Sequence, residues 1–276
     1  MDDALVRLTH QPAGVTTLTL NRAAKRNALS REVLRELESA LTAVKSTRDL
    51  RLLILAAEGP VFCAGMDLGE MQSRAGLSES DALWHEDARL FAGLLGDHVR
   101  LPCPTLAAVQ GPALAGGLGL VLACDMVVAS ANAWFALPEP RRGIVAAAVM
   151  PLLIHRIGAG RAGHLLLSGR NLSAADAHTA GLCHEVAVPD QFDRRVSELS
   201  AAILTGGPTA LAATKDFLLR TSAADLWSQL DAAVELSARA RSTPEAREGL
   251  QAFLEKRPPA WSPDPAQPAE STGTAP

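Results

Sequence analysis

The first part of the chain alternates between strand-like and helix-like patterns of hydrophobic residues. Residues 15–20 alternate apolar and polar positions with a period of two, which predicts a half-buried strand. Ser30 then precedes apolar positions at helical spacing from Val33 to Val44, and its hydroxyl suits the N-cap of a helix. The continuous apolar run 51–56 predicts a buried strand. Together these segments form a strand–helix–strand unit.

The alternation continues to about residue 130 and then gives way to helices. We expect a helix over 81–99, a strand over 105–109, a short apolar helix over 116–123 and a strand over 125–130. Such an order predicts an α/β fold with parallel strands and right-handed crossovers. Beyond Pro151 the pattern predicts mainly helices, at 160–168, 173–180, 190–205, 208–220, 224–240 and 244–256.

Two glycine-containing segments follow apolar strands of this pattern, at 62–68 (FCAGMDL) and 111–119 (GPALAGGLG). Glycine lacks a Cβ, so the backbone there can approach a ligand and present a bare N–H group. Two such groups directed at one carbonyl oxygen form an oxyanion hole, which contributes about 3 kcal/mol per donor in acyl chemistry. The two glycine-containing segments together indicate acyl-ester or acyl-thioester chemistry. The glycines by themselves are more typical of ordinary tight turns.

Composition narrows the classes of function. The 276 residues are 48% hydrophobic, enough to bury a large core. The formal net charge is −4 and the Lys and Arg residues are scattered, so we expect no nucleic-acid partner. The acidic amino terminus lacks an apolar signal core, and the longest apolar run, 114–124, is too short to cross a membrane. We therefore expect a cytoplasmic protein, with its four cysteines reduced in the core.

Motifs for other chemistries are missing. The run 117–122 lacks the third glycine of a dinucleotide-binding GxGxxG, and no GxSxG of a serine hydrolase occurs. No two histidines are spaced as metal ligands around a glutamate, so we expect no metal.

Glu139 stands out among the carboxylates. It lies in the otherwise apolar stretch 136–140, and Pro140 holds it in an extended conformation. Apolar surroundings raise the pKa of a carboxyl group toward neutrality, which suits a general acid or base. A glutamate in a surface loop fits the same pattern equally well.

Taken in order, the motifs resemble the enoyl-CoA hydratase/isomerase (crotonase) family, and within it the 3-methylglutaconyl-CoA hydratase-like branch. The resemblance runs from about residue 5 to 257. It rests on KRNALS at 25–30, FCAGMDL at 62–68, VQG at 109–111, AGG at 115–117, ACD at 123–125, LPE at 137–139 and AFLEKR at 252–257.

The resemblance implies a ClpP-like spiral of ββα units that forms two sheets. It implies a spiral core with the acyl-CoA site over residues 1–200 and a helical region for trimerisation over 201–257, which leaves a Pro-rich tail over 258–276. We expect the tail to be disordered, because it contains no Leu, Ile or Val. A homotrimer or homohexamer is implied, with an acyl-CoA thioester as substrate and no further cofactor.

The resemblance also assigns catalytic residues. The backbone N–H groups of Met66 and Gly116 would hold the thioester oxygen, and Glu139 would be the acid and base. Hydratases of the family usually carry a further glutamate where this chain has Gly119, and Ala147 stands where dehalogenases and dienoyl isomerases place an Asp. We favour hydration of a 2-enoyl-CoA. A Δ3,Δ2-enoyl-CoA isomerase, a decarboxylase and a non-catalytic acyl-CoA binding subunit remain alternatives.

Substrate-binding candidates follow from the same resemblance. Lys25, Arg26, Phe253 and Lys256 would contact the CoA moiety, although a solvated loop and an ordinary helix end fit them nearly as well. Arg141 and Arg142 could pair with an acyl carboxylate or lie in solvent. The remaining candidates lie in or near the glycine segments and the variable acyl pocket, where Phe91 could also belong: Ala64, Asp67, Leu68, Met71, Trp84 and Gly117.

Overall fold

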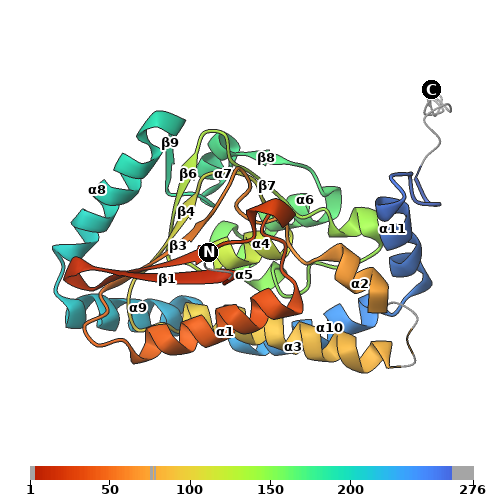
Figure 1. Cartoon of the computed structure of the whole chain (residues 1–276), viewed down its shortest axis with the longest axis horizontal. Helices are drawn as coiled ribbons and strands as arrows, with labels where there is room; N and C mark the ends of the chain where they lie inside the picture. Colours follow the sequence, from red (N-terminus) through yellow and green to blue (C-terminus); the bar gives the residue numbers. More distant parts are fainter. Residues whose placement is uncertain (1–3, 75–76, 78, 263–276) are drawn as a thin grey trace, which may run out of the picture.

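The computed structural model describes residues 4–74, 77 and 79–262, and its main element is a six-stranded sheet. The strand order is β1-β2-β3-β4-β6-β9 (Figure 1). β1 and β2 form an antiparallel hairpin, whereas every later pair of neighbours is parallel, as the sequence pattern predicts. The strands are β1 (Val6–Gln11), β2 (Val15–Leu20), β3 (Leu52–Ala57), β4 (Thr105–Val109), β6 (Met126–Ser130) and β9 (Glu185–Ala187).

A second, smaller sheet lies next to the glycine segment 111–119. β5 pairs in parallel with β7, and β7 pairs antiparallel with β8. An isolated bridge between Cys63 and Ala113 connects the two predicted glycine segments directly. The strands of this sheet are β5 (Ala113–Leu114), β7 (Trp134–Ala136) and β8 (Leu172–Ser173).

Helix α1 (Arg31–Ser46) confirms the helix that was predicted to follow Ser30. The Ser30 side chain accepts a hydrogen bond from the Val33 N–H, so the helix begins at the predicted cap. Its apolar side chains, including Leu37 and Val44, are fully buried in the main core. The opposite face of the sheet carries a smaller apolar cluster that is covered by α8 (Phe192–Leu204). The sheet is therefore buried on both faces, as parallel sheets generally are.

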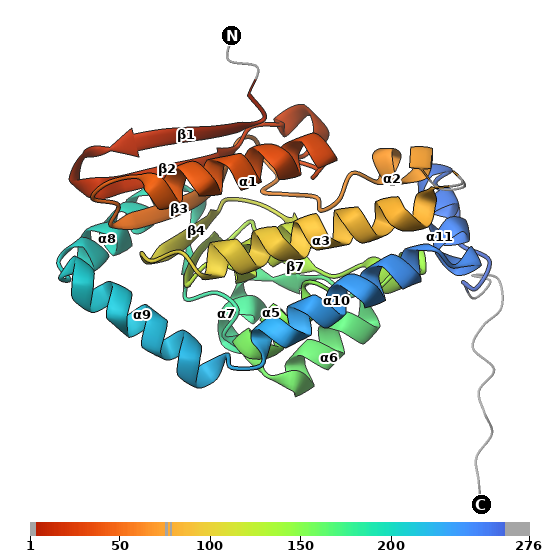
Figure 2. The same ribbon diagram turned by 90° about the horizontal axis from the view of Figure 1, so that it is seen from below.

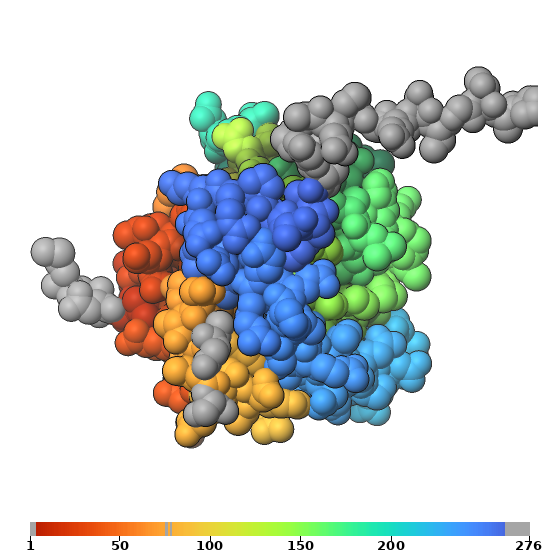
Figure 3. Space-filling model, turned by 90° about the vertical axis from the view of Figure 1, so that its right-hand side faces the viewer, coloured from red at the N-terminus to blue at the C-terminus, as the bar shows by residue number. Residues whose placement is uncertain are grey.

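The other helices build up one side and one end of the molecule. α3 (Ser80–Val99) and α10 (Leu226–Arg241) run side by side along much of their length (Figure 2). α11 (Pro244–Leu254) covers one end of the molecule, where it packs on α2 and on η3 (Figure 3). The remaining α-helices are α2 (Leu68–Arg74), α4 (Gly116–Leu122), α5 (Met150–Ile157), α6 (Ala159–Ser168), α7 (Ala174–Ala180) and α9 (Pro208–Ser222). The 3-10 helices are η1 (Pro12–Gly14), η2 (Ala23–Lys25), η3 (Glu139–Arg142) and η4 (Pro189–Gln191).

The carboxy-terminal region is helical, as expected, and consists of α9, α10 and α11. Of the tail predicted to be disordered, residues 263–276 lie outside the described residues. All four cysteines are buried and free.

Candidate active site

A cavity lies where six segments of the chain meet. Its walls come from the segment 64–71, helix α3, the start of α4, η3, the segment 144–149 and helix α10. Most of the lining is apolar and includes Phe91 and Ala147. The predicted site residues that line it are Ala64, Met66, Leu68, Met71, Gly116 and Glu139.

Asn27 fixes the loop that carries Met66. Its buried side-chain amide donates hydrogen bonds to the carbonyl groups of Glu58 and Val61, at 2.9 and 2.8 Å. The Cys63 thiol in turn donates to the Asn27 carbonyl at 3.0 Å. These contacts hold the segment before Met66 against the loop that follows β2.

The backbone of Met66 is oriented by a short parallel bridge to Leu29. The Leu29 N–H donates to the Gly65 carbonyl at 2.8 Å, and the Asp67 N–H donates to the Leu29 carbonyl at 3.0 Å. Backbone groups alternate in direction along an extended segment, so the N–H of Met66 points away from Leu29. No backbone hydrogen bond of the described residues uses that N–H, which leaves it available to a ligand.

The second N–H group belongs to Gly116, the first residue of α4. The first N–H groups of a helix have no acceptor within the helix. Ala115 before it has φ 51° and ψ −126°, a conformation that is strained for a residue with a Cβ. A Cβ built on Gly65 would lie 3.2 Å from the Gly116 nitrogen, so the two glycine segments touch. The free N–H groups of Met66 and Gly116 therefore lie beside one cavity, as an oxyanion hole requires.

Glu139 is buried beside the same cavity. It is the first residue of the 3-10 helix η3, so the extended conformation predicted from Pro140 is wrong, because the chain turns into the helix at this residue. Burial raises the pKa of its carboxyl group to about 7, although its own backbone N–H and the positive charges of Arg142 and Arg241 act in the opposite direction. Its Oε2 atom is buried and has no hydrogen-bond partner among the described residues. Such a group can take up and release a proton near neutral pH.

Hydratases of the resembled family usually carry a second carboxylate at position 119. In this chain neighbouring side chains occupy the space around Gly119. A Cβ on Gly119 would lie 3.0 Å from the Val149 side chain and 3.2 Å from the Phe91 ring. Both of those side chains are buried. Glu139 is the only carboxylate among the described residues that line the cavity.

The comparisons with known proteins agree with this geometry. The family model described as "Enoyl-CoA hydratase/isomerase" matches residues 10–264. The chain belongs to this family. It is 35% identical over 267 residues to a mitochondrial methylglutaconyl-CoA hydratase of Mus musculus, covering 94% of this chain and 83% of the relative. It is also 35% identical over 254 residues to the mitochondrial enoyl-CoA hydratase domain-containing protein 2 of Homo sapiens, covering 89% and 85%.

A solved structure supports the same family. An enoyl-CoA hydratase from Mycobacterium avium superposes with a TM-score of 0.82 at 34% sequence identity, covering 94% of this chain and 100% of that one. The two sheets and the helical carboxy-terminal region are thus those of a crotonase fold, as the motifs indicate.

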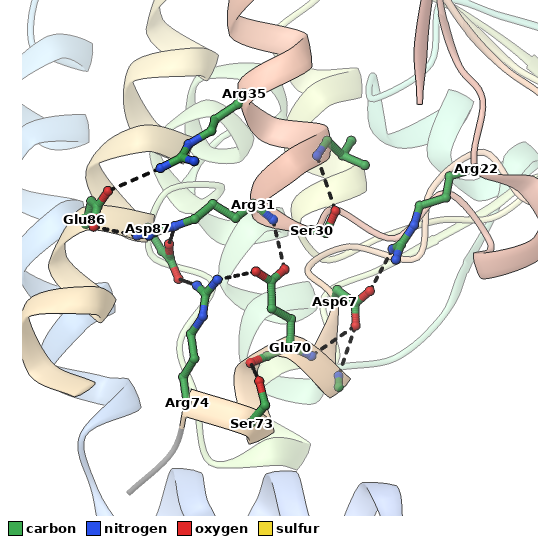
Figure 4. Close-up of polar contacts among 12 residues, drawn as sticks. Arg22, Ser30, Arg31, Arg35, Asp67, Glu70, Ser73, Arg74, Glu86 and Asp87 are labelled. Atoms are coloured by element: carbon green, nitrogen blue, oxygen red, sulfur yellow. Dashed lines mark hydrogen bonds and ion pairs between the residues drawn. The ribbon is translucent and has the colours of Figure 1, made fainter. Parts of the chain in front are cut away.

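Other predicted residues of this family member lie outside the cavity lining. The Asp67 carboxylate caps α2 by accepting from the N–H groups of Gly69 and Glu70, and it pairs with Arg22 at 2.7 Å (Figure 4). Gly117 faces Cys63, because a Cβ there would lie 2.5 Å from the Cys63 carbonyl oxygen.

The remaining candidates are distributed around the site. Trp84 lines a second cavity, which shares four residues with the first: Met71, Arg142, Ile144 and Arg241. Phe253 stacks on the Arg142 guanidinium with 4.4 Å to the ring centre. Lys25, Arg26 and Lys256 are exposed and line neither cavity.

Sequence reasoning missed Arg241, which lines the first cavity from the last turn of α10. Cations are common in the last turn of helices, so nothing in the local sequence distinguishes Arg241 from the neighbouring Arg239. Only the packing of α10 along α3 brings it to the cavity.

Two further features concern the described part of the chain. No three His, Cys, Asp or Glu side chains there gather as metal ligands would. Likewise, none of its helices is both long and apolar enough to cross a membrane.

Proposed function

We propose that this protein adds water to a 2-enoyl-CoA thioester with Glu139 as its only carboxylate acid and base. The N–H groups of Met66 and Gly116 would bind the thioester oxygen and stabilise the negative charge that develops on it. Ionised Glu139 would take a proton from water while the oxygen adds to Cβ. The resulting enolate would then take that proton at Cα, which regenerates the carboxylate.

The observation that carries this proposal is a buried carboxyl group with a pKa of about 7 beside two backbone N–H groups that have no backbone partner among the described residues. The relatives named as hydratases support water addition. The absence of a second carboxylate at Gly119 gives the Δ3,Δ2-enoyl-CoA isomerase reaction as the second candidate, since moving one proton between Cα and Cγ needs a single base.

The outer contacts of the substrate belong to the same proposal. Lys25 and Arg26 lie on the loop after β2, exposed and positively charged, which suits the phosphates of CoA. Phe253 and Lys256 would approach the CoA moiety of a neighbouring subunit in a homotrimer or hexamer. Phe253 lies in the last turn of α11 and Lys256 follows the end of that helix, and both side chains are exposed.

Replacing Glu139 by Gln tests the function. The change keeps the size of the side chain and removes its ability to accept a proton, so turnover should fall by about 10²–10⁴-fold with acyl-CoA affinity largely kept. Products would be identified by mass spectrometry after incubation in D₂O with 2-enoyl, 3-enoyl and carboxylated enoyl thioesters.

Each outcome of that experiment has one meaning. Gain of one D₂O supports the hydratase, whereas a shifted double bond without water assigns the isomerase, and loss of CO₂ assigns a decarboxylase. Binding without any chemical change would contradict all three reactions and leave an acyl-CoA binding subunit. A fully active Glu139→Gln variant would remove Glu139 from the mechanism.

A further inference from the structure

Ion pairs hold both ends of helix α2, which begins two residues after Met66 of the oxyanion hole (Figure 4). Arg22 binds Asp67, the residue just before α2, at 2.7 Å. Arg74, the last residue of α2, binds Asp87 of α3 at 2.9 Å. The helix has seven residues, and one of them is buried. A helix this short is not stable by itself in water, so its position depends on such contacts.

Asp67 uses both oxygens of its carboxylate. Its Oδ1 atom accepts hydrogen bonds from the N–H groups of Gly69 and Glu70, at 3.1 and 3.2 Å, and so caps α2. Its Oδ2 atom accepts from the Arg22 guanidinium at 2.7 Å. The side chains of Arg22 and Asp67 are only 22% and 21% exposed, so this pair is better shielded from solvent than a surface pair. The orientation of the carboxylate is therefore fixed from two sides.

Arg22 is itself held by the loop 22–28. Its Nη1 group also donates to the Ala28 carbonyl at 3.1 Å, and its backbone N–H donates to Oδ1 of Asn27 at 2.8 Å. Asn27 is the residue whose amide holds the segment before Met66. One loop thus fixes the chain around Met66 at two places, through Asn27 before it and through Arg22 after it.

The Met66 N–H lies, along the chain, between these two attachments. The bridge to Leu29 holds the segment along one edge, through the N–H of Asp67 and the carbonyl of Gly65. The Arg22 contact adds an attachment at the side chain that follows the N–H group. An error of about 1 Å in the place of a catalytic group can cost about 100-fold in rate, so this additional attachment matters for an oxyanion donor.

We propose that Arg22 is a positioning residue of the oxyanion hole, and that its ion pair with Asp67 holds the Met66 N–H in place for the thioester oxygen. This role rests on the proposed function in one respect, namely that the Met66 N–H binds that oxygen. Arg22 lines neither cavity of the site, so it acts through Asp67 and not on the substrate. The competing explanation is that the pair only stabilises α2, and in that case the pair of Arg74 with Asp87 should matter as much.

The carbonyl group of a bound thioester tests this directly. Butyryl-CoA with an isotope label at the thioester carbonyl carbon would be bound to each protein, because it is saturated and cannot be hydrated. Hydrogen bonds lower the stretching frequency of a carbonyl, so infrared difference spectra should show a lower frequency in the wild-type complex than in water. In Arg22→Met most of that shift should be lost, and kcat/KM for hydration should fall by about 10-fold to 100-fold. A folded Arg22→Met protein that keeps the wild-type frequency would overturn the inference, whatever its rate.

Asp67→Asn tests the same contact from its other partner. An asparagine has a single side-chain oxygen, which can accept from the N–H groups of α2 or from Arg22 but not from both. Because asparagine is a good N-cap, we expect that oxygen to stay with α2 and the bond to Arg22 to be lost. The carbonyl shift should then decrease as in Arg22→Met. An Asp67→Asn protein with the wild-type frequency would contradict the role of Arg22, and this variant decides the question if Arg22→Met does not fold.

Arg74→Met is the matched control, because it removes the ion pairs at the other end of α2. It should lower the free energy of unfolding in urea, whereas its complex should keep the wild-type carbonyl frequency. Equal losses of the shift in Arg74→Met and Arg22→Met would show that only the general order of α2 matters, and would overturn the inference.

The proposed function can fail separately. If the carbonyl shift depends on Arg22 but the wild-type protein hydrates no enoyl thioester, the hydratase is wrong and the positioning role stands. If the wild type hydrates enoyl thioesters and Arg22→Met keeps both the rate and the shift, the hydratase stands and the positioning role is wrong. A wild-type complex without any shift would contradict the oxyanion hole, and the role of Arg22 with it.

Discussion

At the scale of single residues, Gly119 decides how many carboxylates the cavity can hold. We expect Gly119→Glu to lower the free energy of unfolding by about 2 kcal/mol or more, because the new side chain overlaps Val149 and Phe91 and places a carboxylate among apolar groups. Turnover should not increase. Urea denaturation measures the first effect and a hydration assay the second.

Gly163 provides the matched control for that substitution. It lies within α6, and a Cβ there meets no atom within 4 Å. Gly163→Ala should therefore raise the free energy of unfolding by about 0.5–1 kcal/mol through helix propensity. A Gly119→Glu protein as stable as wild type and faster in hydration would show that the cavity accommodates a second glutamate after all.

Glu139 should make the activity depend on pH. Water addition begins with the ionised carboxylate, and burial raises the pKa of that group to about 7. We expect kcat/KM to fall about tenfold per pH unit below pH 7 and to level off above it. Initial rates from pH 5 to 9 at low substrate measure this. A profile that is flat between pH 5.5 and 8 would contradict the role of Glu139 as the base.

The same raised pKa should affect stability. Between pH 4.5, the ordinary pKa of the group, and about 7, the folded state holds a proton that the unfolded state has lost. Stability from this group is therefore present below pH 4.5 and decreases as the pH rises to 7, by about 3 kcal/mol. Glu139→Gln lacks the ionisation, so its free energy of unfolding relative to wild type should increase over this range. Denaturation of both proteins at several pH values tests the difference.

At the scale of elements, Lys215 joins the carboxy-terminal helices to the main sheet. From α9 its buried ammonium group donates to the Cys103 carbonyl at 3.0 Å and to Asp125 at 2.7 Å, at the ends of β4 and β6. Lys215→Met should cost about 2–4 kcal/mol of stability, because Asp125 loses its cation and is itself only partly exposed. Arg220→Met breaks an exposed pair on the same helix and should cost less than about 1 kcal/mol. Equal costs for the two variants would contradict the role of Lys215.

The elements that the sequence predicts well have local signals. α1 has a Ser cap and a periodic apolar face, and β4 is a continuous apolar run, so each was predicted close to its observed bounds. β1 was missed, because its outer half is exposed and polar and it is defined by pairing with β2. α2 was also missed, because its beginning depends on Asp67, whose capping role is not visible in the apolar pattern.

At the scale of the whole molecule, the site combines segments that are far apart in the chain. The sequence motifs predicted Met66, Gly116 and Glu139, and the fold brings all three to one cavity. The motifs could not indicate Arg241, because its place depends on how α10 packs, nor that Asp67 faces Arg22 rather than the cavity. Local patterns thus predict the cavity residues that belong to sequence motifs better than a residue such as Arg241, which reaches the cavity only through the packing of distant helices.

Assembly of several copies is the last expectation, and exposed apolar residues support it. Phe217 and Leu218 on α9 are 67% and 58% exposed in the single chain, and Leu218 borders a groove formed with α5. Water-exposed side chains of this size are stabilised when a partner covers them. We expect the protein to sediment as a trimer or hexamer at micromolar concentration.

Replacing both residues tests whether this face is part of the contact. Phe217→Ser combined with Leu218→Ser should weaken association by about 10²-fold or more, because two apolar side chains lose their burial between subunits. Val188→Ser, at an exposed apolar position beyond β9, is the control and should leave the assembly intact. If the double variant keeps the sedimentation coefficient of the wild type at every concentration, the subunits meet through another face. If the wild type itself sediments as a monomer, the trimer implied by the family resemblance is wrong for this chain, and Phe253 and Lys256 cannot reach the CoA of a neighbour.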